Sequence, residues 1–124
     1  MSTLKVNTIQ NTSGNFGSTP EQIQQGIAKV WVNFDATSNS AIRDSFNVSS
    51  IVDENTGYFN INFSSALPSG NYAIFCQAST GNDLSFSGAD EDFNAAGSCR
   101  VITRTTRTSN ITDFPYTGVT IFGD

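Results

Sequence analysis

The residues best suited to chemistry in this 124-residue chain are seven carboxylates, nearly all of which fall in turn-like segments. Two carboxylates that flank a glycosidic bond can cleave it, one as the acid and the other as base or nucleophile. The spacing singles out no such pair, and solvated loop charges explain the same pattern. The chain has no histidine, the commonest general base, so we expect no enzymatic activity and no catalytic residue. The carboxylates are Asp44, Asp53, Glu54, Asp83, Asp90, Glu91 and Asp92.

The acidic run Asp90-Glu91-Asp92, with Asn94 and Asp83 nearby, offers the oxygen ligands that Ca²⁺ prefers. The run lacks the spacing of an ordered calcium loop, so we expect no metal site and no cofactor. The two cysteines, Cys76 and Cys99, cannot form a Cys/His zinc site without histidine. Both fall in predicted strands, and we expect buried thiols, with a disulfide between them as the alternative.

Three arginines lie along one predicted strand, where period-two alternation puts Arg100 and Arg104 on one face and Arg107 on the other. They either keep an exposed face soluble or pair with acidic loops of a neighbouring copy. Trp31 lies on the polar side of its predicted strand, where it is core, a subunit contact or a platform that stacks on a sugar. Trp31, Arg100 and Arg104 are therefore the candidate subunit-interface residues.

Composition bounds the class of protein. The net charge of −5 and the pI of about 4.3 disfavour binding to nucleic acid, because an acidic chain repels phosphate. No apolar run approaches the roughly 20 residues that span a bilayer, and the N-terminus resembles no signal peptide. We therefore expect a protein made in a cytoplasm, with no membrane partner. Ten phenylalanines against one methionine favour strands.

The first 26 residues are predicted to lie outside the globular core. Residues 1–18 form an extended arm, with a strand-like run at residues 4–9 followed by a flexible polar stretch. Residues 19–26 form a short helix, because Thr19 suits the N-cap, Pro20 the first helical position and Gln22 the third residue of a capping box. Gly26 ends this helix.

Residues 27–124 are predicted to form one all-β domain, a β-sandwich of jelly-roll-like type. Val30, Val32 and Phe34 alternate with Trp31 and other residues of the opposite face, which is the pattern of a half-buried strand. Several short strands separated by turns are typical of a sandwich. Residues 81–97 are expected to be loop-rich. The expected strands are residues 27–35, 41–48, 50–53, 58–64, 72–78, 99–108 and 116–122.

Several strings, taken in order, resemble a module of virion structural and tail-fibre proteins of marine bacteriophages, especially phages of cyanobacteria. The arm string LKVNTIQNTSG resembles the motif that often opens such proteins. The resemblance covers the arm and roughly residues 27–75, and it implies a trimeric structural part of a virion. The strings are LKVNTIQNTSG (residues 4–14), KVWVNFD (29–35), AIRDSFNVSSI (41–51), TGYFNINF (56–63), LP (67–68) and NYA (71–73).

The leading hypothesis is a non-enzymatic homotrimer on the virion surface, bound to the major capsid protein or to tail or fibre proteins. The compact globule without a shaft favours a capsid decoration or cement protein. The alternative is a short tail fibre or fibre tip that recognises a host-surface glycan through Tyr58, Phe93 and Tyr116. We expect the arm to attach by adding a strand to a partner's sheet, with Leu4, Val6 and Ile9 as apolar anchors.

Overall fold

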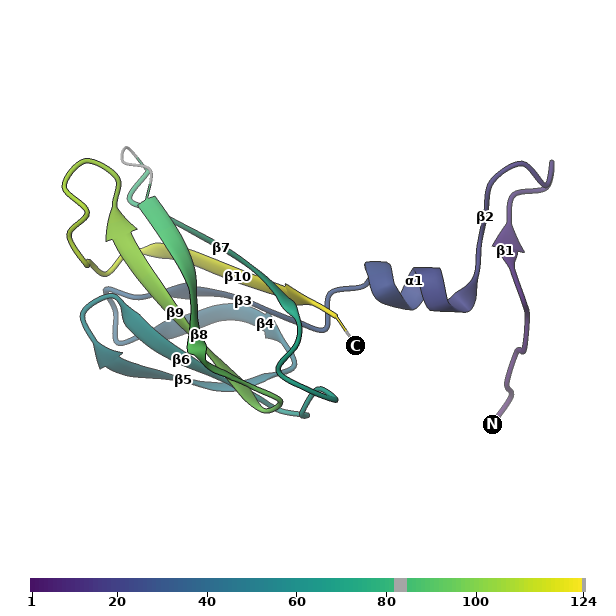
Figure 1. The fold of residues 1–124 in the computed structure, drawn as a ribbon, viewed down its shortest axis with the longest axis horizontal. Helices are drawn as coiled ribbons and strands as arrows, with labels where there is room; N and C mark the ends of the chain where they lie inside the picture. The colour runs from purple at the N-terminus through teal and green to yellow at the C-terminus, as the bar shows by residue number, and fades with distance from the viewer. Residues whose placement is uncertain (82–84, 124) are drawn as a thin grey trace.

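The computed structural model describes residues 1–81 and 85–123 and shows two four-stranded antiparallel sheets packed face to face (Figure 1). This confirms the predicted all-β sandwich. One sheet has the strand order β4-β3-β10-β7 and the other the order β5-β6-β9-β8. The strands are β3 (Val30–Asp35), β4 (Ala41–Phe46), β5 (Val48–Asn55), β6 (Tyr58–Phe63), β7 (Ala73–Ser79), β8 (Ser85–Ala95), β9 (Ser98–Thr105) and β10 (Tyr116–Phe122).

The core lies between the sheets and is built by alternation along the central strands. In β3, Val30, Val32 and Phe34 are buried, as the period-two pattern predicts. Phe34 packs edge-on against Phe59 of the facing sheet, with ring centroids 5.3 Å apart. The apolar core is therefore contained in the sandwich. Its other buried members are Ala36, Ile61, Phe63, Leu67, Cys99, Val101, Val119 and Ile121.

The crossing from the first sheet to the second depends on Asn47, which stands between β4 and β5. Its φ of 57° is left-handed, a conformation that asparagine tolerates better than most residues. Its side-chain amide donates to the carbonyl oxygens of Lys29 and Ser65, and its side-chain oxygen accepts from the Ser65 N–H. These bonds explain why the predicted single strand over residues 41–48 is divided at this residue.

The helix α1 (Pro20–Gly26) has the predicted N-terminus. The Thr19 side chain accepts a hydrogen bond from the Gln22 N–H, and the Gln22 side chain accepts one from the Thr19 N–H. At the other end, the Lys29 ammonium donates to the Gln24 carbonyl oxygen, 2.9 Å away. None of the α1 residues is buried. No helix in residues 1–81 and 85–123 is long and apolar enough to cross a membrane.

The arm projects from the sandwich beyond α1 (Figure 1). The predicted strand over residues 4–9 is wrong for most of its length: only β1 (Ile9–Gln10) is a strand, and it pairs with β2 (Gly17–Ser18). The two-residue pairing is short because residues 1–17 are all exposed and make no apolar core that could order a longer strand.

Residues 81–97 also differ from the expectation, because β8 is an eleven-residue strand rather than a loop. It lies at the edge of its sheet and pairs with β9 alone, with an irregular register between Asp90 and Ala95. An edge strand tolerates glycine and charged residues, which explains the loop-like composition. The strand β9 is shorter than predicted, so Arg107 lies in the turn after it rather than on its opposite face.

The end of the sandwich near the β5–β6 turn is closed by residues 110–114. Gly57, in that turn, donates its N–H to the Asp113 carboxylate and accepts a hydrogen bond from the Thr103 N–H. Phe114 is 1% exposed, although the sequence assigned it to no element. Its carbonyl oxygen accepts a hydrogen bond from the Ala36 N–H, which fixes this segment to the chain after β3.

Candidate functional site

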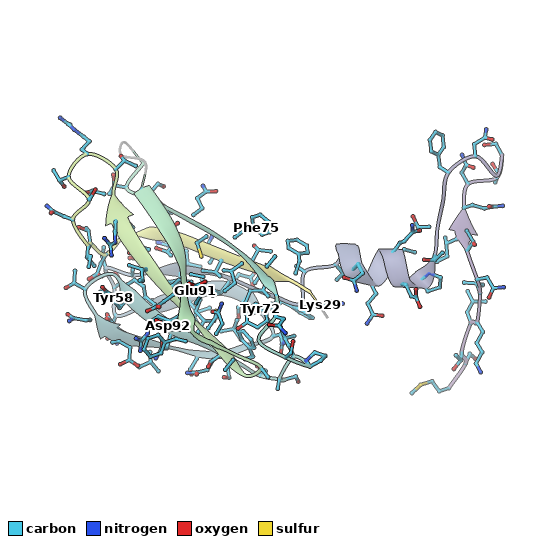
Figure 2. The ribbon with its side chains drawn as sticks, viewed as in Figure 1. Lys29, Tyr58, Tyr72, Phe75, Glu91 and Asp92 are labelled. Carbon is cyan, nitrogen blue, oxygen red and sulfur yellow. The ribbon has the colours of Figure 1, made fainter. Side chains whose placement is uncertain are left out.

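The outer face of the β4-β3-β10-β7 sheet carries a row of large aromatic side chains. Trp31 of β3 lies opposite Phe46 of β4 on one side and Thr120 of β10 on the other, and Thr120 lies opposite Phe75 of β7. Phe46 and Phe75 are 54% and 62% exposed. Figure 2 shows Phe75 pointing away from the sandwich. Side chains alternate between the two faces along β3. Because Val30 and Val32 point into the core, Trp31 points to this outer face.

The next outward-facing row is small and polar. Asn33, Gly118 and Gln77 lie side by side on β3, β10 and β7. A side chain added at Gly118 would meet no atom within 4 Å, so the row is hollowed at its centre. Beyond it, Tyr116 at the start of β10 is 56% exposed. The hollow therefore lies between an aromatic row on one side and Tyr116 on the other.

This hollow, here called the aromatic trough, has a volume of about 810 Å³ and is open to solvent. None of its twelve lining residues is charged. The volume lies in the range of small-molecule sites, which combine apolar walls with a few polar groups. The side chains and backbone that define it belong to Trp31, Asn33, Phe75, Gln77, Tyr116 and Gly118.

An ion pair forms one rim of the trough. The Arg43 guanidinium lies 2.9 Å from the Asp35 carboxylate and 4.9 Å from the centroid of the Tyr116 ring. The pKa of Asp35 is below its usual value, chiefly because the Thr37 hydroxyl donates a hydrogen bond to the carboxylate. Asp35 therefore holds Arg43, and Arg43 restricts the Tyr116 ring.

The opposite outer face, on the β5-β6-β9-β8 sheet, is here called the arginine face and carries Arg100 and Arg104. The alternation along β9 confirms that these two share a face. The Arg100 guanidinium stacks 3.5 Å from the Phe93 ring centroid and donates to the Asn60 side-chain oxygen. Among the described residues, Arg104 has no ion-pair partner. Trp31 lies on the other side of the sandwich, so the three interface candidates are not brought together.

The predicted glycan-contacting residues are also divided between the faces. Tyr116 lines the aromatic trough, whereas Phe93 lies under Arg100 on the arginine face and Tyr58 begins β6. The aromatics that accompany Tyr116 are Trp31 and Phe75 instead. Sequence reasoning missed Phe75 because its proximity to Trp31 depends on the long-range pairing of β3, β10 and β7.

The candidate carboxylates that the structure describes are divided among three strands. Those within the described residues lie in β4, β5 and β8 rather than in turns, while Asp83 lies outside the described residues. Burial and the nearby charge of Asp113 raise the pKa of Asp53. In residues 1–81 and 85–123, no three acidic or cysteine residues gather closely enough to hold a metal ion.

The two cysteines are free thiols in facing sheets, Cys76 on β7 and Cys99 on β9. Burial raises the pKa of each to about 12, from an unfolded value of 9.0. The thiolate is the reactive form, so we expect both cysteines to react slowly with alkylating reagents in the folded protein at neutral pH.

We expect this burial to make stability pH-dependent. The folded protein keeps protons that the unfolded chain releases above pH 9, so stability is full below pH 9 and falls as pH rises towards 12. The loss at pH 10 is roughly 1 kcal/mol for each thiol. Urea unfolding at pH 8 and pH 10 measures it, and Cys76→Ala should show a smaller difference. Equal free energies of unfolding at the two pH values would contradict this.

The aromatic trough is thus the place where the described residues combine stacking surfaces, unpaired amide groups and open volume. Trp31, Phe75 and Tyr116 supply the rings, and Asn33 and Gln77 the amides. The chain matches no protein-family model, no curated protein and no solved structure significantly.

Proposed function

We propose that the protein is a non-enzymatic structural protein of a bacteriophage particle, held on the virion surface by its N-terminal arm. One observation carries the proposal: residues 1–17 are exposed, join neither four-stranded sheet and project from the sandwich (Figure 1). An arm that makes no contact with the sandwich does not stabilise it. An arm that binds a second protein becomes ordered in that complex and contributes to the binding there. The resemblance of the arm and of residues 27–75 to phage modules supports the virion as that partner.

The anchors are apolar residues that the protein itself leaves uncovered. Leu4, Val6 and Ile9 are 83%, 39% and 55% exposed. The extended backbone around them can add a strand to an open sheet edge of the major capsid protein or of a tail protein, with the side chains filling pockets of that partner.

The place on the particle has two candidates. A compact globule on a short arm fits a capsid decoration or cement protein, which is present in hundreds of copies. The aromatic trough favours the second candidate, a short tail fibre or fibre tip that binds a host-surface glycan. The number of copies per particle, measured by quantitative mass spectrometry, separates the two, because fibres number a few dozen or fewer.

The assembly we propose is a homotrimer, in which three arms on one side of the axis add their weak affinities. In a closed trimer, each subunit contacts its two neighbours through surfaces that lie next to each other on the subunit. If the subunits touched through opposite faces of the sandwich, they would form an open stack instead of a closed ring. Trp31 and Arg104 therefore belong to different contacts. We assign the trimer contact to the arginine face, where Arg104 can pair with acidic groups such as the exposed Glu91 and Asp92 of the next copy (Figure 2).

The test is deletion of residues 2–18, which should leave a folded sandwich that no longer sediments with particles. Replacing Leu4, Val6 and Ile9 together by serine should lower particle binding at least tenfold. Phe16→Ser is the matched control, because Phe16 is 79% exposed in the arm outside the anchor stretch. We expect this variant to bind like the parent protein.

Light scattering on the same proteins measures the assembly. A mass three times 13.3 kDa is expected for the full chain. Truncated protein that still decorates particles would contradict the arm proposal, and a full-length monomer would contradict the trimer.

A further inference from the structure

We propose that the aromatic trough binds a neutral oligosaccharide, whose sugar rings stack on Trp31, Phe75 and Tyr116. The inference rests on the second candidate function, the glycan-binding fibre tip, and names its site and ligand class. A pyranose ring has an apolar face of C–H groups and a rim of hydroxyls. It therefore requires flat aromatic surfaces with hydrogen-bonding groups beside them, and the trough supplies both.

The aromatic surfaces are spaced for several sugar units. Trp31 and Phe75 lie in one row with β10 between them, so their backbones are about 10 Å apart. Tyr116 lies four residues along β10 from that row, which is about 13 Å at the rise of an antiparallel strand. Platforms at these separations can contact different rings of one oligosaccharide, while the hollow at Gly118 admits the chain between them.

The polar groups are suited to hydroxyls. Asn33 and Gln77 flank Gly118, and both are exposed. Each amide donates and accepts hydrogen bonds, as a sugar hydroxyl does, so they can pair reciprocally. The trough lining has no charged residue and the chain has a net charge of −5, which disfavours phosphorylated or acidic sugars.

The competing occupant of this face is a second copy of the chain. A second copy packed on this face would bury Asn33 and Gln77 and would have to supply hydrogen-bond partners for both amides, as well as a side chain that fits the Gly118 hollow. An oligosaccharide satisfies the two amides and fills the hollow, so the observations favour it. Self-association through this face is kept as an outcome of the test.

The experiment uses the full chain and a panel of neutral oligosaccharides of three to five pyranose units, with sialylated and uronic-acid-containing counterparts. Trp31 is the single tryptophan, so its fluorescence reports binding in the trough directly. We expect at least one neutral oligosaccharide to shift this emission saturably and its acidic counterpart to bind more weakly.

Two variants locate the site. Phe75→Ala removes a platform, and Gly118→Val adds bulk in the hollow at a position where a Cβ would meet no atom within 4 Å. Each should weaken binding at least tenfold. Gly97→Val is the matched control, because a Cβ at Gly97 would also meet no atom within 4 Å and the residue lies in the turn between β8 and β9 of the other sheet. Its dissociation constant should equal that of the parent protein.

Three results would overturn the inference. They are the absence of saturable binding across the panel, equal weakening by Gly97→Val, or trimers that become monomers on Phe75→Ala, which would assign the face to a second copy. The proposed virion attachment fails separately, because Gly118→Val should still sediment with particles and the arm-deleted protein should still bind the oligosaccharide.

Discussion

Phe34→Ala is expected to lower the free energy of unfolding by about 3–5 kcal/mol, the usual range for a buried phenylalanine. Phe34 is fully buried in β3 and packs edge-on against Phe59 of the facing sheet, so its removal leaves a cavity where the two sheets meet. Domains of this size have total stabilities of about 5–15 kcal/mol, so the variant should be marginally folded or unfolded at 37 °C.

The matched control is the same substitution at the surface. Phe75 is 62% exposed, and Phe75→Ala should change stability by less than about 1 kcal/mol. Urea unfolding followed by circular dichroism measures both variants against the parent. If the two substitutions cost the same, the assignment of Phe34 to the core and Phe75 to an open face is wrong.

Gly57→Ala is expected to cost roughly 2–4 kcal/mol, since it combines left-handed strain with overpacking. The φ of Gly57 is 70°, a conformation that alanine adopts at a cost. The added methyl group would also lie 2.8 Å from the Thr103 carbonyl oxygen and against the Ile111 side chain. Backbone atoms cannot rotate away, so the β5–β6 turn must separate from residues 110–114.

Gly81→Ala separates the two contributions to that loss. Gly81 has a φ of 93°, but a side chain there would meet no atom within 4 Å. Only the conformational cost of about 1 kcal/mol should remain. Thermal unfolding of the two variants provides the comparison, and a Gly57→Ala protein no less stable than Gly81→Ala would refute the close approach.

The sequence predicted the elements whose signals are local. The capping box of Thr19 and Gln22 fixed the start of α1, and the alternation around Val32 identified β3 and its buried face. β8 was not predicted, because it is a strand through its pairing with β9 and not through its own composition. An exposed edge strand does not need alternating apolar residues, so the sequence around Asp90 carries no strand pattern.

Only part of the candidate site could be predicted from the sequence. The alternation along β3 predicted that Trp31 points outward, but it did not predict which aromatic residues lie near Trp31. Phe75 and Tyr116 reach the same face because β10, at the end of the chain, inserts between β3 and β7. The order of strands in a sheet depends on contacts between residues far apart in the sequence, and no local sequence pattern predicts these contacts. The pairing of Arg100 with Phe93 depended on the same kind of contact.

The link between arm and sandwich also has a mechanical consequence. α1 has seven residues and none is buried, so tertiary packing does not support it, and isolated helices of that length are marginal. Under tension between an anchored arm and the globule, α1 would extend before the sandwich does, from about 10 Å to about 23 Å. The load then enters through β3, an interior strand bonded to β4 and β10 on both sides. With its arm anchored as proposed, the protein would absorb a pull by extension of α1 while the core of the sandwich stays covered.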